Sequence, residues 1–573
     1  MVHLYSWLSY LLFLAIITVL VKPLGGYVER VFSGKRTPLD RICSPVEKVI
    51  YRAARVDANR EMGFSEYASC FLVFGLVCTL VLYVMLRLQR FLPWFYPTYH
   101  TTPLSPDLAM NVAVSFSTTS TWQSYSGETT MSYFSQMAGL CVQNFLAAAA
   151  GLAVGIAFIR GLARQMSNCL GNFWVDLTRA LLWILLPGAL LGALLLVWQG
   201  VPMNFHSYAL ARTVEGANQV IPQGPVAALE IIKNLGTNGG GFFNANGAHP
   251  YENPTPLANF LEMLAIVLLP AALTNTFGRM VRQPRQGWLL YGVMVLLFSG
   301  GLFFVHHFEQ RGNPLLRGVA ATHSAQQPGG NMEGKEVRFG IGDTTLTAVV
   351  TSNTATGSTN AMDDSFTSLA GMVLLMNMLV GELVFGGLGT GLYSMIMAAT
   401  VAVFLAGLMV GRTPEYLGKK IGPTENKMIM LYILAAPMTV LTLSAIAVSC
   451  KAGLSGLTIN SGAHGLTTIL FAYTSCFANN GQAFAGLSAN STFYNVTTAV
   501  AMMMGRFGLA IPALAFAASF ARQRNTPASS GTLPTESLTF GAFLTACLII
   551  MTALSYLPAL ALAPILERLR FGA

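Results

Sequence analysis

The 573-residue chain is 53% hydrophobic, and only 10% of its residues are charged. Soluble domains carry about 25% charged residues, so this composition excludes an ordinary soluble protein and indicates a polytopic membrane protein. The net charge of +9 comes from cations scattered over turns between apolar segments, which argues against a nucleic-acid-binding face.

Ten apolar segments are long enough to cross a bilayer, because a spanning helix needs about 20 apolar residues. The first apolar run, residues 4–21, lacks both a basic start and a following cleavage site, which predicts a retained helix rather than a signal peptide. The sequence therefore predicts an all-α membrane protein with about 10 transmembrane helices. The spans centre on Leu12, Val77, Ala148, Leu186, Leu264, Val295, residues 374–408 (one long broken element), Ala435, Met504 and Ile549.

Positive charges predict the orientation, because loops rich in Lys and Arg stay in the cytosol. If the first helix runs inward, the basic segment 22–66 is cytosolic, and the N-terminus faces outside. The remaining basic turns then fall on the cytosolic side too. They hold Arg160, Arg164, Arg279, Arg282, Arg285, Arg412, Lys419, Lys420, Lys427, Arg522 and Arg524.

Four polar stretches rich in Gly, Asn and Thr recur roughly every 120 residues between the apolar spans, at 118–123, 236–241, 353–358 and 474–481. One such stretch would usually be a surface turn. Irregular backbone at membrane depth, however, is tolerated only where protein buries it or where it lines a wet cavity. Four equally spaced stretches, all on the predicted outer side, therefore indicate four walls of one ion pathway.

A short helix is predicted before each polar stretch, at 108–116, 225–235, 344–351 and 465–473. Ser105-Pro106-Asp107 gives the first of these a clear start, because Ser caps a helix and Pro favours its first turn. Each helix is too short to span the bilayer. A short helix followed by a polar segment that leaves by the same side is a re-entrant pore loop.

The repeat divides the chain into four pseudo-symmetric span–pore loop–span units plus one extra helix at each end. The predicted segments are 1–60, with the N-terminal helix and a cytosolic loop, the four repeats 61–165, 166–284, 285–425 and 426–526, and 527–573, with the C-terminal helix. The third repeat differs, because Gly-rich residues 381–391 interrupt its second span. Broken helices line ion paths in transporters, although two ordinary helices joined by a Gly turn are the alternative.

Oxygen atoms must replace the water of a dehydrated cation, and potassium filters supply them from rings of backbone carbonyls. Glycine permits the backbone conformations that such a ring needs, and Thr and Ser add hydroxyl oxygens. We therefore expect the four loops to form one K+ filter. Its expected residues are Thr119, Ser120, Thr121 and Gln123, then Thr237, Asn238, Gly239 and Gly240, then Thr356, Gly357 and Ser358, and finally Asn479, Asn480 and Gly481.

Segments 122–130, 236–246, 411–420 and 485–490 resemble the KdpA family, the channel-like subunit of the bacterial Kdp potassium pump. The resemblance covers essentially the whole chain. It implies one filter position per loop, at Gln123, Gly239, Gly357 and Gly481. The family's first loop usually carries Asn where this chain has Thr119 and Thr121.

Two charged residues lie within predicted spans, where charge is costly and indicates function. Arg506, below the expected filter, would oppose direct passage of a cation to the cytosol; alternatively it pairs with Glu382 or a backbone carbonyl, or snorkels to the inner surface. Glu382, at the broken helix, would attract the ion after the filter or serve as a structural partner for an Arg. The expected path and gate comprise Glu382, Gly386, Gly387, Gly389 and Arg506.

Other residues carry structural expectations. Asp176 and Arg179 are three residues apart on one helical face, which predicts a local ion pair. Lys419 and Lys420 are expected to form an inside-facing anchor or a subunit contact. The cysteines show no metal-binding spacing, and Cys476, within the fourth polar stretch, is expected to be the most accessible of them.

The chain has no GxxxxGK[ST] loop and no Asp-Lys-Thr-Gly phosphorylation sequence. Its longest predicted cytosolic segment, about 45 residues, is too short for an ordinary nucleotide-binding domain. We therefore expect no catalytic residue and no cofactor in this chain, only K+ as the transported ion. Energy for uphill transport would come from a partner or from an ion gradient.

The resemblance implies a non-catalytic subunit that passes K+ through a tunnel to a P-type ATPase catalytic subunit, which uses ATP and Mg2+. It also implies two small single-span subunits, KdpC-like and KdpF-like, in a bacterial inner membrane, with lipid as the surroundings and no nucleic-acid partner. A stand-alone K+ channel or symporter of the same superfamily is the alternative. A sensor of extracellular K+ is a further alternative, but it would need an output domain.

Overall fold

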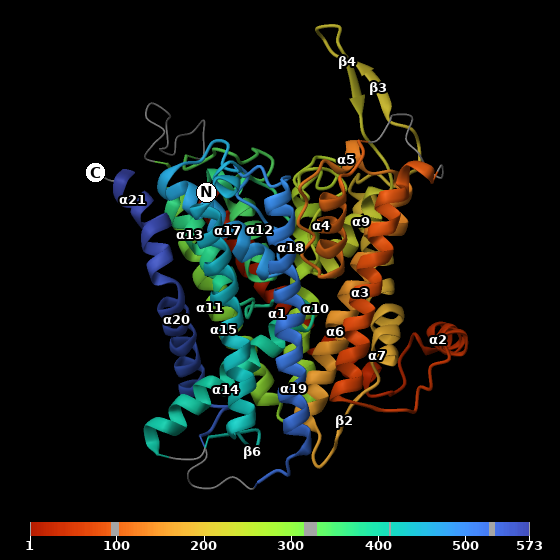
Figure 1. Ribbon diagram of the computed structural model, residues 1–573, viewed down its shortest axis with the longest axis vertical. Helices are drawn as coiled ribbons and strands as arrows, with labels where there is room; N and C mark the ends of the chain where they lie inside the picture. The colour runs from red at the N-terminus through yellow and green to blue at the C-terminus, as the bar shows by residue number, and fades with distance from the viewer. Residues whose placement is uncertain (1, 93–101, 314–328, 412–413, 527–532, 572–573) are drawn as a thin grey trace.

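The computed structural model describes residues 2–92, 102–313, 329–411, 414–526 and 533–571. Within these residues, ten helices are long and apolar enough to cross a membrane, and they match the ten predicted spans in order. They form one bundle with short helices and irregular loops gathered at one end (Figure 1). The prediction of an all-α, multi-pass membrane protein is confirmed. Arg412 and Thr413, predicted as part of a basic turn and a family motif, lie outside the described residues.

Among the described residues, four of the spanning elements contain a π-helical segment. The spanning elements are α1 (Val2–Phe32), α3 (Phe64–Leu88) with η1 (Gln89–Phe91), η2 (Ser135–Cys141) with α6 (Val142–Ala163), α7 (Phe173–Arg179) with η3 (Ala180–Leu185) and α8 (Leu186–Trp198), α10 (Pro256–Met280), α11 (Pro284–Gln310), α14 (Thr390–Val410), α15 (Pro423–Ser449), α18 (Thr492–Met503) with η5 (Met504–Gly508) and α19 (Leu509–Arg522), and α20 (Leu538–Leu560) with η6 (Ala561–Ile565) and α21 (Leu566–Phe571).

Four pore helices precede the four polar stretches, as the sequence predicts. They are α4 (Pro106–Ser117), α9 (Val226–Leu235), α12 (Gly340–Asn353) and α17 (Gly462–Phe477). The expected start of α4 is observed, because the Ser105 hydroxyl accepts a hydrogen bond from the Leu108 backbone N–H at 3.3 Å. Each pore helix ends directly at its polar stretch, so its C-terminal carbonyls face the loop.

The remaining elements are short. They are α2 (Asp40–Ala54), α5 (Gly127–Thr130), η4 (Asp363–Ser365), α13 (Ser368–Leu379), α16 (Lys451–Leu454) and the strands β1 (Met62–Gly63), β2 (Cys169–Gly171), β3 (Ala209–Arg212), β4 (Asn218–Ile221), β5 (Glu415–Tyr416) and β6 (Lys419–Lys420). Strands β3 and β4 pair as an antiparallel hairpin that extends beyond the bundle at the end where the pore loops lie (Figure 1).

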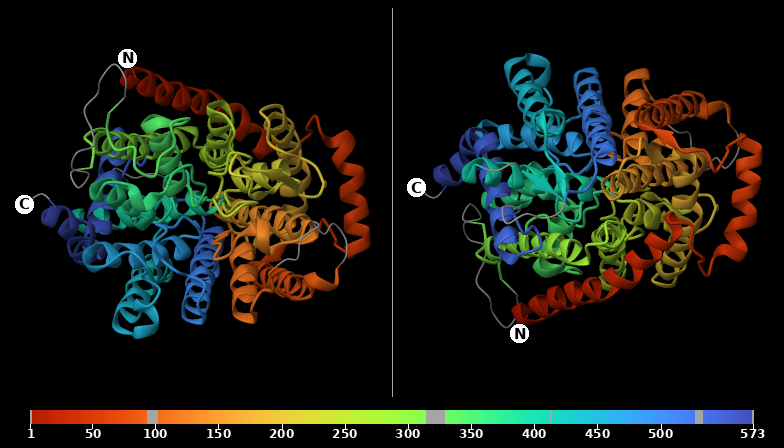
Figure 2. Two further views of the ribbon diagram at one scale, coloured as in Figure 1. Left: turned by 90° about the horizontal axis from the view of Figure 1, so that it is seen from above. Right: turned by 90° about the horizontal axis from the view of Figure 1, so that it is seen from below.

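The repeats lie around a common centre. Viewed along the bundle, the chain colour progresses around the middle from orange through yellow and green to blue, and blue returns beside orange (Figure 2). The closing contact between the fourth and first repeats includes a hydrogen bond from the Asn111 amide to the Asn495 carbonyl at 2.7 Å. This cyclic order brings four loops that are distant in sequence to one place.

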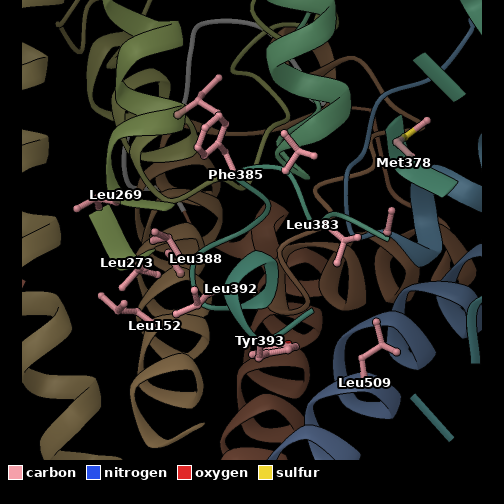
Figure 3. Packing of buried hydrophobic residues seen from close by; sticks show 14 of the residues in the cluster. Leu152, Leu269, Leu273, Met378, Leu383, Phe385, Leu388, Leu392, Tyr393 and Leu509 are labelled. Atoms are coloured by element: carbon pink, nitrogen blue, oxygen red, sulfur yellow. The ribbon is translucent and has the colours of Figure 1, made fainter. Parts of the chain in front are cut away.

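The centre of the bundle is packed through small residues. Helix α6, the most buried span, lies against the broken segment between α13 and α14. A Cβ atom at Gly155 would lie only 2.6 Å from the Gly389 Cα, so both glycines are needed for this close approach. Leu152, Leu388, Leu392 and other apolar side chains fill the space around it (Figure 3).

The predicted pairing of Asp176 with Arg179 is wrong. The Asp176 carboxylate binds Arg160 of α6 at 2.8 Å, whereas Arg179 binds Glu47 of α2 at 3.0 Å. The two side chains of α7 thus find partners on two different helices. Contacts between helices, and not the i,i+3 spacing within α7, therefore determine the partners of Asp176 and Arg179.

The structure shows an internal contact for Lys419, and the expectation that Cys476 is the most accessible cysteine is wrong. Lys419 is buried, and its ammonium group donates to the carbonyl of Leu162 at 2.7 Å and to that of Arg164, because the β5–β6 hairpin folds against the end of α6. Only Lys420 of the pair is exposed. Cys476 is fully buried, because the last turn of α17 enters the core.

Candidate functional site

The four polar stretches share one backbone pattern. In each stretch, two residues have a left-handed backbone conformation with positive φ, and the single residue between them has negative φ. Backbone of this kind turns successive peptide groups to the same side, as carbonyls that line one axis require. The paired positions are Thr119 and Thr121 (φ 67° and 42°), Thr237 and Gly239 (51° and 78°), Ala355 and Gly357 (54° and 75°), and Asn479 and Gly481 (51° and 89°).

This pattern defines which residues are equivalent. Thr121 aligns with Gly239, Gly357 and Gly481, whereas Gln123 lies two residues further along the first loop. All the expected filter residues are buried except Gln123, which is partly buried. The geometry therefore differs from the register that the family resemblance implies for the first loop.

Three glycines form tight joints between neighbouring loops. A Cβ atom at Gly239 would lie 1.5 Å from the Thr356 carbonyl oxygen, and one at Gly357 would lie 2.2 Å from that of Asn480. A Cβ atom at Gly481 would lie 2.1 Å from the Ser120 carbonyl oxygen. No side chain fits at these positions without moving the next loop.

The fourth joint closes the cycle with a side chain. The Thr121 hydroxyl donates a hydrogen bond to the Asn238 carbonyl oxygen. At every joint the partner is thus the carbonyl of the residue before the equivalent position of the next loop. The four loops form one closed ring in the order of the chain, with three glycine joints and one threonine joint.

Side-chain amides hold the loops in place. The Gln123 amide donates to the Gly241 carbonyl at 3.0 Å and accepts from the Gly241 N–H at 2.9 Å, which ties loop 1 to loop 2. Asn479 donates to the Ser120 hydroxyl at 2.8 Å, and Asn480 donates to the Thr351 carbonyl at 2.7 Å. These contacts hold the loop backbones, and with them the backbone carbonyl oxygens, in fixed positions.

Hydroxyl groups in loops 2 and 3 serve as further links. The Ser358 hydroxyl donates to the Asn234 side chain at 2.6 Å, and the Thr356 hydroxyl bonds that of Thr354 at 2.9 Å. The Thr237 hydroxyl accepts from the Leu388 N–H at 3.0 Å. The last contact joins the ring directly to the broken segment below it.

A buried charged cluster supports loop 2, and the sequence reasoning did not include it. Lys233 binds Glu230 at 2.8 Å and donates to the Gly240 carbonyl at 2.7 Å. Glu252 accepts from the N–H groups of Phe243 at 3.1 Å and Gly247 at 3.0 Å, and burial raises the pKa of this carboxyl. The signal that could have revealed the cluster is the Glu–Lys pair, three residues apart, inside the short helix predicted at 225–235.

The broken segment places the expected gate beneath the ring. Residues 380–389 leave the helical conformation, with positive φ angles at Gly381, Glu382, Phe385 and Gly389. Glu382 is buried, and its Oε1 atom has no hydrogen-bond partner among the described residues. Gly386 packs on the Glu382 carbonyl, and Gly389 packs on that of Gly151. Gly387 lies near the Thr237 hydroxyl.

Arg506 lies under the first loop, in the π-helical turn η5. Its side chain is buried and donates to the Ala147 carbonyl at 2.6 Å and to the Thr119 hydroxyl at 3.3 Å. Of the alternatives stated above, pairing with a backbone carbonyl is observed, and snorkelling is not. The described residues show no direct ion pair between Arg506 and Glu382.

Two cavities flank the ring. A hollow at the loop end of the bundle is lined by residues of all four polar loops or of the segments that follow them, including Gln123, Asn244, Asp363 and Gly481. A second cavity includes Glu382 in its wall and lies between α13, α14, α15, α17 and α20. Its polar lining consists of Glu382, Ser394, Tyr432, Thr474, Thr552, Ser555 and Tyr556.

The fold and this buried ring define a multi-pass membrane protein with a polar centre built from four re-entrant loops. The family model described as "Potassium-transporting ATPase A subunit" (KdpA) matches residues 11–569. The chain therefore belongs to the KdpA family.

Curated relatives match the chain over nearly its whole length. A protein of Methylobacterium nodulans is 51% identical over 98% of this chain and 97% of its own, and one of Koribacter versatilis is 50% identical over 99% of both chains. Both are named "Potassium-transporting ATPase potassium-binding subunit". The crystal structure of the potassium transporter TrkH from Vibrio parahaemolyticus overlaps with a TM-score of 0.48 at 13% identity, over 71% of this chain and 77% of that one.

Proposed function

We propose that this chain is the potassium-binding and translocating subunit of an ATP-driven K+ uptake pump. The single observation that carries the proposal is the closed ring of four equivalent loops, whose backbone is held by other groups. A filter for a dehydrated cation needs such a ring of fixed carbonyl oxygens. The names of the relatives support potassium as the ion.

The carbonyl ends of the four pore helices add to the attraction for a cation. Each helix ends next to its loop, and the C-terminus of a helix carries a partial negative charge. The carbonyl oxygens of the equivalent residues Thr119, Thr237, Ala355 and Asn479, with their neighbours in each loop, form the proposed binding positions. In this proposal the hollow at the loop end of the bundle faces the outside, and potassium enters from it and loses its water at the ring.

Below the ring, the ion is proposed to leave sideways. Arg506 places a buried positive charge under loop 1, which opposes direct descent toward the opposite side of the membrane. Glu382 offers a carboxylate in the wall of the second cavity. In this proposal the cavity leads to a P-type ATPase catalytic subunit that uses ATP and Mg2+ and releases K+ inside.

The surroundings follow from the same proposal. The complex would lie in a bacterial inner membrane, with the N-terminus and filter loops outside, and would contain two small single-span subunits. The alternative of a stand-alone channel or symporter is not favoured, because the relatives are named as subunits of an ATPase. K+ currents at channel rates through the purified chain alone would support that alternative instead.

The test is the K+ dependence of ATPase activity in a reconstituted complex that carries Gly239→Asp. A side chain at this joint must displace the Thr356 carbonyl, so we expect a weaker apparent K+ affinity and poorer discrimination against Na+. Gly216→Asp is the matched control, because Gly216 lies in the β3–β4 turn with open space around it. Unchanged affinity and selectivity in the Gly239 variant would reject the filter assignment.

A further inference from the structure

A basic pocket lies between α1 and α10, at the end of the bundle opposite the pore loops. It is lined by Lys22, Pro23, Gly26, Tyr27, Arg30 and Arg279. The three cations are exposed, and among the described residues no acidic side chain forms an ion pair with any of them. The proposed filter and path make no use of this pocket.

The pocket lies at a membrane boundary. The apolar run of residues 4–21 ends at Lys22, and Arg279 lies in the last turn of α10. Both helices therefore place their first cations at the same level, where the hydrocarbon region gives way to lipid headgroups. A ligand at this level can have both an apolar and a charged part.

Arg279 is held so that its terminal amino groups remain available. Its Nε donates to the Asn275 side chain at 2.8 Å, and its guanidinium lies against Gly26, where an added Cβ atom would be 3.2 Å from Cζ. Both terminal amino groups lack a hydrogen bond to the rest of the described residues. A planar guanidinium fork with two free amino groups matches the geometry of a phosphate group.

Lys22 and Arg30 flank this guanidinium on α1, and the Tyr27 ring forms part of the wall. The Tyr27 hydroxyl is occupied, because it donates to the Trp183 carbonyl at 2.8 Å. In the part of the chain that the structure describes, no acidic side chain pairs with any of these three cations around one concave site at the bilayer boundary. Basic pockets of this kind between transmembrane helices bind anionic lipid headgroups.

We propose that this pocket is a specific site for the phosphate headgroup of an anionic phospholipid such as phosphatidylglycerol. The phosphodiester would bind the Arg279 fork, with Lys22 and Arg30 on either side, and the acyl chains would lie along α1 and α10. The bilayer position of the pocket selects a lipid over a soluble phosphate compound.

The experiment uses the purified full-length chain in mixed micelles of phosphatidylcholine and phosphatidylglycerol, with native mass spectrometry as the readout. We expect the wild-type chain to retain phosphatidylglycerol, and the triple variant K22Q/R30Q/R279Q to bind it about 100-fold more weakly, since each cation near the headgroups contributes about fivefold. Lys22→Arg keeps the charge and should retain the lipid, which would show that the positive charge at this position is what the lipid requires.

The matched control is R282Q/R522Q/R524Q, which removes the same charge from exposed arginines of the same end of the molecule. This control should bind phosphatidylglycerol like the wild type. Equal loss in both triple variants, or equal retention, would overturn the site. Displacement of the lipid by sn-glycerol 3-phosphate would also overturn it, because the site would then belong to a soluble phosphate compound.

Discussion

The three glycine joints of the ring and the single threonine joint perform the same task by different means. At Gly239, Gly357 and Gly481 the next loop approaches so closely that no side chain fits. At Thr121 a hydroxyl fills the corresponding space and donates to the Asn238 carbonyl. Three joints thus depend on the absence of a side chain, and the fourth depends on its presence.

The same difference extends beyond the joints. Loop 1 is held by side chains, since Gln123 binds Gly241, Arg506 reaches Thr119 and Thr121 reaches Asn238. The Asn238 carbonyl oxygen already accepts a hydrogen bond from the Thr121 hydroxyl, so it has less electron density to offer a cation than the carbonyls at the three glycine joints. The ring is therefore closed but unequal, and the interface of loops 1 and 2 is the place where its ion affinity can be tuned by side chains.

The largest effect is expected at a glycine joint. Gly357→Ala places a Cβ atom 2.2 Å from the Asn480 carbonyl oxygen and adds strain at a φ of 75°. We expect an apparent K+ affinity at least 100-fold weaker, measured as K+-stimulated ATPase activity of the reconstituted complex. Gly216→Ala, in the β3–β4 turn, has a similar φ and open space, and should leave the affinity unchanged.

The next effect concerns the charge that supports loop 1. Arg506→Gln removes a buried cation that donates to the Ala147 carbonyl and the Thr119 hydroxyl. We expect passive Rb+ flux through proteoliposomes that contain the complex to rise about tenfold, because the electrostatic barrier below the ring is gone. A flux equal to the wild type would show that Arg506 is only a structural brace. Arg522→Gln, at the exposed end of the same span, is the control.

Substitution at the threonine joint should have a smaller effect on K+ affinity than substitution at a glycine joint. Thr121→Val removes one hydrogen bond to Asn238, worth about 1 kcal/mol, and should change the apparent K+ affinity about fivefold. Thr121→Ser keeps the hydroxyl and should behave as the wild type. Thr121→Gly creates a fourth glycine joint, and we expect its affinity to change by less than that of Gly357→Ala. An equal loss in these last two variants would remove the distinction between the joints.

The smallest effect is expected at Gln123. Gln123→Ala loses both hydrogen bonds to Gly241, which lie at the partly exposed outer edge of the ring. We expect a change in apparent K+ affinity of about threefold, smaller than that of Thr121→Val, in the same ATPase assay. A larger effect for Gln123 would indicate that its side chain, rather than Thr121, occupies the position equivalent to the glycines.

Local sequence patterns predicted the helices and the broken segment, but they could not predict contacts between residues far apart in the sequence. The pore helices were predicted because short apolar runs with starts such as Ser105-Pro106-Asp107 precede each polar stretch. The break near Gly386 was predicted because several glycines lie within one apolar run. Partners such as Arg160 for Asp176 and the Leu162 carbonyl for Lys419 depend on how distant helices pack, which no local pattern records.

The register of loop 1 could not be predicted from the sequence for the same reason, because it depends on contacts between loops. Thr121 does not resemble a glycine, so only its left-handed backbone and its contact with Asn238 identify it as the fourth joint. The cluster around Lys233 was missed because the carbonyl it binds belongs to the loop that follows its helix. In both cases a side chain acts on a neighbouring backbone, and residue type alone does not show this.

The most direct test of the central claim is selective cation binding by the purified chain itself. A cation that binds only the folded chain raises its melting temperature with a concentration dependence set by its dissociation constant. We predict that K+ stabilises the wild-type chain at concentrations where Na+ does not, and that Gly481→Ala abolishes this difference while Gly216→Ala preserves it. Equal stabilisation by K+ and Na+, or full retention of K+ selectivity in Gly481→Ala, would contradict the four-loop filter.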